Sequence, residues 1–134
     1  MASTFRLQII TPNGIFYDDE IESLIVTTPE GQMGFLARHI PIIAPLEIGL
    51  VKIKKGGQFR EAVNSDGFVQ VKRGYTRVVT DSAEWPEEID VERAKAAKER
   101  AEGFLESGES HVDILRAEAA LQRANTRLRA AGQL

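Results

Sequence analysis

Arginines are the residues of this 134-residue chain whose type and spacing point most directly to chemistry. Arg116, Arg123 and Arg127 follow one another at i, i+7 and i+11, a spacing that places all three on one face of a helix. Arg93 and Arg100 repeat the i, i+7 spacing earlier in the chain. A guanidinium group binds phosphate or carboxylate oxygens through paired hydrogen bonds. The pattern is consistent with a solvated face, with an anion site that grips a triphosphate, or with a surface that meets an acidic partner, and spacing alone does not separate these.

The sequence carries no signature of catalysis. It has neither a Gly-x-x-x-x-Gly-Lys-Ser/Thr phosphate loop nor a Gly-x-Ser-x-Gly elbow. The two histidines, His39 and His111, are far apart and lack carboxylates at a ligand-like spacing. We therefore expect no catalytic residue and no metal site. We expect His39 to serve a turn and His111 to be solvated near a helix start.

Composition and charge restrict the class of protein. With 43% hydrophobic residues the chain can bury a core, and its formal net charge of −3 argues against a general nucleic-acid binder. The absence of cysteine suits a reducing compartment. The apolar runs are too short to cross a bilayer, and the first residues do not resemble a signal peptide. We expect a soluble protein of cytoplasmic type, with no nucleic-acid partner and no direct insertion into a membrane.

The elements that must position the arginines fall into two modules, which gives an α+β fold class. Residues 1–84 contain alternating apolar and polar residues separated by glycine-containing turns, at 53–59 and 72–75 for example, which predicts an antiparallel β-sandwich or flattened barrel. Residues 85–134 comprise a linker and an Ala-rich segment that predicts an antiparallel two-helix hairpin.

The hairpin has clear start and stop signals. Asp90 is the expected N-cap of the first helix, Gly108 its stop, and Ser110 the cap of the second helix, with Asp113 completing a weak capping box. Alanine dominates the apolar stripes, which makes the seam between the helices thin and the hairpin mobile. The predicted seam residues are Ala94, Ala97, Ala101 and Phe104 or Leu105 in the first helix, and Ile114, Ala117, Leu121, Ala124 and Leu128 in the second.

Three segments resemble the ε subunit of bacterial F-type ATP synthases. Residues 31–41 are similar to the family's Gly-x-x-Gly-x-x-Pro-x-His-x-Pro segment, although Ala37 replaces the first proline. Residues 63–71 are similar to its Ser-Gly-Gly-Phe-x-x-Val strand, with Asp66 in place of a glycine. Residues 89–94 match the Ile/Leu-Asp-x-x-Arg-Ala motif that bacterial members use for ATP. The likeness covers essentially the whole chain.

The resemblance implies a sandwich of about ten strands that binds the γ subunit and the c-ring, in a rotor subunit on the cytoplasmic face of the bacterial plasma membrane. It implies a mobile hairpin that inhibits ATP hydrolysis in the catalytic head, which consists of the α and β subunits. There, Arg116 and the basic face of the second helix meet an acidic loop of the β subunits. It further implies that ATP, with or without Mg²⁺, favours the compact conformation. By this resemblance, the residues that contact partner subunits are Glu30 and Gln32, which face the c-ring, and His39 and Arg116. The residues that the resemblance assigns to ATP binding are Glu84, Ile89, Asp90, Arg93, Ala94, Arg100, Arg123 and Arg127.

One alternative belongs to another class of protein. A hairpin attached to a β module also suits a transcription-associated factor that inserts a coiled coil into RNA polymerase. Acidic residues at the expected tip, 106–110, fit that hypothesis. The segment 31–41 has no role under it.

Overall fold

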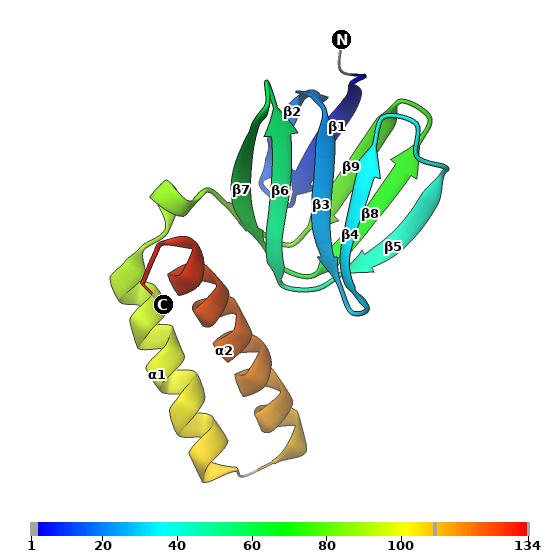
Figure 1. Ribbon diagram of the computed structural model, residues 1–134. Coiled ribbons are helices and arrows are strands. Elements are labelled where there is room, and N and C mark those ends of the chain that lie inside the picture. Colours follow the sequence, from blue (N-terminus) through cyan, green and yellow to red (C-terminus); the bar gives the residue numbers. More distant parts are fainter. Residues whose placement is uncertain (1–2, 109, 134) are drawn as a thin grey trace. The chain divides into compact units, whose positions relative to one another are not determined.

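The computed structural model describes residues 3–108 and 110–133, the side chain of Val112 excepted. The chain divides into two compact units, 1–84 and 85–134 (Figure 1). The first unit is built from strands and the second from helices.

The first unit is a sandwich of two five-stranded sheets, with strand orders β2-β1-β9-β8-β5 and β10-β7-β6-β3-β4. Paired strands of the described part are antiparallel except for β1 and β9, which are parallel. The predicted sandwich of about ten strands is confirmed. The strands are β1 Phe5–Thr11, β2 Gly14–Ile21, β3 Ser23–Thr28, β4 Gly31–Leu36, β5 Ile42–Leu46, β6 Gly49–Lys55, β7 Gln58–Asn64, β8 Gly67–Lys72, β9 Tyr75–Thr80 and β10 Ala83–Glu84.

Alternation along the strands builds the core between the sheets. In β1, Leu7 and Ile9 are fully buried while Arg6 is exposed, as the period of two requires. The tight β6–β7 turn depends on Gly56 and Gly57, whose φ angles are 60° and 76°. Both angles lie in the left-handed region that favours glycine. The predicted hairpin tip within 53–59 is confirmed, because β6 and β7 pair antiparallel across this turn.

Strand β2 joins the two sheets along one edge of the sandwich. The Arg6 guanidinium, on the neighbouring strand β1, donates to the Asp18 carboxylate over 2.7 Å and holds the pKa of Asp18 below its ordinary value. The Lys55 ammonium, on β6 of the opposite sheet, donates to Asp19 and likewise lowers the pKa of that carboxyl. Asp19 therefore connects the sheets through a charged contact at the surface.

These two carboxylates make the stability of the chain depend on acid pH. Because their folded pKa values are depressed, they stabilise the fold above the unfolded pKa of about 3.9 and lose that contribution as the pH falls through the folded values. We expect urea midpoints to decrease as pH falls below about 4, and to do so less in the double variant Asp18→Asn, Asp19→Asn. Superimposable pH profiles for the two proteins would contradict this assignment.

The second unit consists of a short 3₁₀ turn, η1 Pro86–Glu88, and two helices, α1 Val91–Ser107 and α2 His111–Ala130. Asp90 caps α1 by accepting a 3.0 Å hydrogen bond from the backbone N–H of Arg93, and Gly108 ends the helix in the left-handed conformation. Ser110 caps α2 by accepting from the N–H of Asp113. The predicted antiparallel hairpin with these caps is confirmed. His111 is exposed as the first residue of α2, as expected.

The seam between the helices is narrow and rich in alanine. Leu128 is the only large apolar helix side chain of the described residues that is buried there. Of the two alternatives left open near the end of α1, Leu105 is half-buried and Phe104 is 58% exposed, so Phe104 lies outside the seam. The buried apolar helix residues are Ala94, Ala101, Ala117, Ala124 and Leu128.

Candidate functional site

Five arginines occupy one flank of the hairpin. Each of them directly precedes a buried seam residue, as Arg93 precedes Ala94 and Arg116 precedes Ala117. One residue turns an α-helix by about 100°, so each arginine stands at the same angle from the seam. In antiparallel helices, equal angles from the seam bring side chains to the same flank. The five are Arg93 and Arg100 on α1 and Arg116, Arg123 and Arg127 on α2.

A crevice of about 320 Å³ opens on this flank, toward the tip of the hairpin. It is lined by Arg100 from α1 and Arg116 from α2, and the sequence-based set of ATP contacts contains only the first of these. Asp113 and the exposed ring of Phe104 also line it, and neither was expected to be functional from the sequence. Among the described residues, the side chains of Arg100, Arg116 and Asp113 form no hydrogen bond or ion pair. The crevice therefore presents two guanidinium groups and one carboxylate that pair with no other described side chain.

The remaining arginines lie toward the other end of the hairpin. Figure 1 shows the end of α2 beside the start of α1. Arg93 belongs to the first turn of α1, and Arg123 and Arg127 belong to the last turns of α2. Arg93 is exposed, whereas Arg123 and Arg127 are half-buried. None of the three lines the crevice at the tip. The hairpin thus carries a group of three arginines at one end and a group of two at the other.

The start of α1 combines two apolar contacts with one carboxylate. Ile89 and Ala94 are buried, 9% and 3% exposed, as expected for a hydrophobic staple across the cap. The Asp90 carboxylate is exposed, and one of its oxygens accepts the capping hydrogen bond from the backbone N–H of Arg93. Glu84, which the family resemblance also assigns to ATP binding, is half-buried at the end of β10 and belongs to the first unit.

The residues assigned to partner contact in the first unit lie at opposite ends of β4. Glu30 and Gln32 are exposed around the β3–β4 turn, where the backbone N–H of Glu30 donates to the Thr28 hydroxyl. His39 follows the other end of β4, and its backbone N–H donates to the carbonyl of Leu36. The His39 and Phe35 rings form a T-shaped contact, with centroids 4.8 Å apart. His39 therefore has the turn role expected from the residues, and it does not join Glu30 and Gln32 in one site.

An apolar row crosses the outer face of the first sheet and was not anticipated from the sequence. Strand register aligns five apolar residues across all five strands, and Phe68 and Ile15 are 41% and 62% exposed. The sequence signal was present, because adjacent apolar residues such as Ile9-Ile10 break the alternation. The row is Pro45, Phe68, Val79, Ile10 and Ile15.

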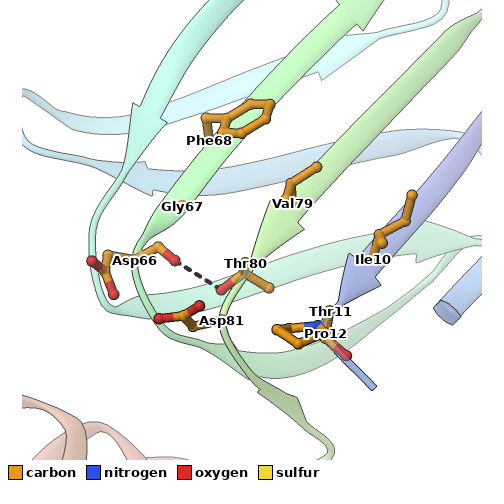
Figure 2. A pocket seen from close by; sticks show the side chains of 9 residues that line it. All are labelled: Ile10, Thr11, Pro12, Asp66, Gly67, Phe68, Val79, Thr80 and Asp81. Carbon is orange, nitrogen blue, oxygen red and sulfur yellow. Dashed lines mark hydrogen bonds between the residues drawn. The ribbon is translucent and has the colours of Figure 1, made fainter. Parts of the chain in front are cut away.

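A hollow of about 460 Å³ lies in this apolar row (Figure 2). Ile10, Pro12, Phe68 and Val79 form its apolar walls. Asp66 and Gly67 line it where β8 begins, Thr80 and Asp81 where β9 ends, and Thr11 at the end of β1. The outer face therefore offers an apolar hollow with an acidic end.

The residues that the structure describes contain neither a metal-ligand cluster nor a membrane-spanning helix. No group of three or more histidine, aspartate or glutamate side chains in this part of the chain is arranged to hold a metal ion. Within the same residues, neither helix has the length and apolar character needed to cross a bilayer.

Comparison with known proteins gives matches over both units. Residues 4–86 match the family model described as the β-sandwich domain of the ATP synthase delta/epsilon chain, and residues 87–132 match the long α-helix domain of the same chain. A protein named ATP synthase epsilon chain from Alkaliphilus oremlandii is 62% identical over 109 residues, covering 81% of each chain. One of the same name from Caldanaerobacter subterraneus subsp. tengcongensis is 47% identical, over 99% of this chain and 97% of the relative.

A solved structure is similar in fold as well. A chain in the cryo-EM structure of the Euglena gracilis mitochondrial ATP synthase, showing its OSCP/F1/c-ring, superposes with a TM-score of 0.84 at 27% identity. The superposition covers 98% of this chain and 82% of the Euglena chain.

Proposed function

This chain belongs to the epsilon-chain family of ATP synthases, and from that premise we propose that it is a non-catalytic subunit of the central stalk, the rotor of an F-type ATP synthase. Its β-sandwich binds the γ subunit and the c-ring, and its hairpin regulates ATP hydrolysis by the α and β subunits of the catalytic head. It is held at the cytoplasmic face of the bacterial plasma membrane through these partners. The RNA polymerase hypothesis has no support of this kind, because both matching family models describe ATP synthase chains.

Two surfaces of the sandwich support its role as an adaptor between rotor subunits. The apolar row on the outer face of the first sheet is suited to a protein partner, which we propose to be γ. The exposed β3–β4 turn with Glu30 and Gln32 supplies a separate polar contact, which we propose for the c-ring.

The construction of the hairpin supports a regulatory role. Hydrophobic stabilisation is about 25 cal/mol per Å² of buried apolar surface, and an alanine side chain buries little. With Ala94, Ala101, Ala117 and Ala124 in the seam, the packed and opened hairpin differ by a small free energy. A ligand with different affinities for the two states then shifts their populations.

ATP is the ligand that we propose for the compact state. Arg93, Arg123 and Arg127 at one end of the hairpin offer guanidinium groups to phosphate oxygens, and Arg100 extends the row toward the tip. The same arginines meet acidic residues of the β subunits when the hairpin is open. Nucleotide and partner therefore compete for one set of charges, and the nucleotide relieves inhibition.

The observation that carries this proposal is the alignment of five arginines on one flank of an alanine-seamed hairpin. Calorimetric titration of the whole chain with ATP and ADP tests it. We expect saturable ATP binding that the double variant Asp90→Ala, Arg93→Ala abolishes. Bound ATP should also raise the unfolding temperature, because a ligand stabilises the state that it binds.

Two controls separate binding from helix stability in this experiment. Asp90→Ser keeps a good N-cap and removes the carboxylate, so it should preserve helix content while it weakens ATP binding. Arg129→Ala removes an exposed arginine from the other flank of α2 and should leave binding unchanged. Absence of binding by the unsubstituted chain at millimolar ATP would reject the nucleotide switch and leave a hairpin that responds to protein partners alone.

A further inference from the structure

We propose that the hollow on the outer face of the first sheet docks a segment of the γ subunit in which an apolar side chain is followed closely by an arginine or lysine. The hollow is defined by Ile10, Pro12, Asp66, Phe68, Val79 and Asp81. The identity of the partner rests on the proposed function, whereas the chemistry of the docking segment comes from the hollow itself.

The apolar part of the hollow calls for an apolar side chain. Phe68 is 41% exposed beside Val79, its register partner on β9, and Val79 in turn pairs with Ile10 on β1. Figure 2 shows the Phe68, Val79 and Ile10 side chains on three successive strands. Continuous exposed apolar surface of this kind typically marks an interaction site. A partner that fills the hollow removes this surface from water.

The acidic end of the hollow calls for a positive charge. The hydroxyl of Thr80 and the backbone N–H of Asp81 donate to the carbonyl of Asp66 over 3.2 and 3.4 Å, which ties the two acidic segments together. Within the described residues, neither the Asp66 nor the Asp81 carboxylate has a hydrogen bond or ion pair. Both remain exposed at the end of an apolar hollow, and no cation among the described residues pairs with them.

Arginine and lysine fit such a site in both respects. Their aliphatic stems cover apolar surface while the charged group reaches a polar boundary. A cation beside Asp66 and Asp81 pairs with both carboxylates, and partial exclusion of water by the apolar walls strengthens the pairing. The hollow thus selects orientation as well as partner, because the apolar and basic groups must follow one another in the right direction.

The test is the binding of the full-length chain to an α/β/γ complex from the same organism that lacks its own ε subunit, measured by calorimetry at low and high salt. We expect Asp66→Asn with Asp81→Asn to weaken binding about tenfold or more at low salt and to reduce its salt dependence, leaving the part that the arginine flank and the β subunits contribute. Phe68→Ala should weaken binding about thirtyfold at both salt concentrations.

A matched control removes two negative charges elsewhere on the sandwich. Glu20→Gln with Glu61→Gln causes the same change in net charge at residues that do not line the hollow, and it should retain full affinity and salt dependence. Because the Asp66 and Asp81 carboxylates have no partners in the described residues, their substitution should leave the fold intact, which thermal unfolding will verify.

The outcomes separate this inference from the function on which it rests. If the unsubstituted chain fails to bind the complex, the proposed rotor function is wrong. If it binds and the aspartate variant binds with the same affinity and salt dependence, the basic docking segment is rejected while the rotor function stands. Equal weakening by the control pair would also reject it, since net charge would then explain the effect.

Discussion

Replacing Leu128 by alanine is expected to remove about 2–4 kcal/mol from the stability of the helical hairpin. Leu128 is 2% exposed, and it is the only large apolar helix side chain that is buried within the described residues. The other buried apolar residues of the described helices are alanines such as Ala94 and Ala124, which are too small to fill the cavity. The loss includes both the transfer of the side chain from water and the cavity left behind.

The measurement is urea unfolding followed by far-ultraviolet circular dichroism, combined with hydrogen exchange resolved along the chain. We expect faster exchange throughout α1 and α2, with β1–β10 little affected, because the seam lies within the second unit. Leu115→Ala is the matched control, since Leu115 lies on the same helix and is 52% exposed. The control should change stability by less than about 0.5 kcal/mol. Equal effects of the two substitutions would show that burial of Leu128 in the seam is not the source of the lost stability.

This variant also bears on the regulatory mechanism. If the compact and open states of the hairpin differ by a small free energy, loss of the Leu128 side chain should shift the population toward the open state. ATP binding should weaken as a consequence, because ATP binds the compact state. Saturating ATP should then recover part of the lost stability. Recovery by ATP connects the seam to the ligand, which stability measurements alone do not achieve.

Much of the fold was predictable because local interactions determine it. The glycine pair Gly56-Gly57 specifies a tight turn through its φ angles, and Asp90 and Gly108 specify the two ends of α1. Such signals involve residues adjacent in sequence, so no knowledge of the fold is needed to interpret them.

The candidate sites were less predictable because they depend on distant residues. The row that joins Phe68 to Ile10 and Ile15 exists only because β9 lies between β1 and β8, a parallel pairing that sequence alternation does not reveal. The crevice at the tip requires Arg100 on α1 and Arg116 on α2 to lie opposite each other, which depends on the register between the helices. Phe104 was assigned to the seam as an alternative to Leu105 because the two differ by only 100° around α1.

The arginine flank shows an intermediate case. Each of its members precedes a seam residue in the sequence, as Arg123 precedes Ala124 and Arg127 precedes Leu128. The spacing was recognised within each helix. The common flank follows from the predicted antiparallel hairpin and its predicted seam, but the division of the flank into two groups depends on the register between the helices.

Reversing three charges on this flank should abolish inhibition of ATP hydrolysis in the assembled enzyme. The variant Arg116→Glu, Arg123→Glu, Arg127→Glu replaces attraction to acidic residues of the β subunits by repulsion. We expect the hydrolysis rate at low ATP to rise about fivefold or more, within the usual range of coupling between regulatory and catalytic sites. Addition of salt should raise the rate of the unsubstituted enzyme toward that of the variant, because exposed charges are screened.

A triple reversal on the other flank is the control for this experiment. Lys95, Lys98 and Arg129 stand away from the arginine flank, so their replacement by glutamate changes the net charge equally without touching the proposed contact. Arg129→Glu also places a carboxylate in the last turn of α2, where the helix dipole disfavours it, as Arg127→Glu does. Both variants therefore carry a similar cost in helix stability. If both relieved inhibition equally, the hairpin would act through its net charge or its stability, and the arginine flank would not be the inhibitory surface.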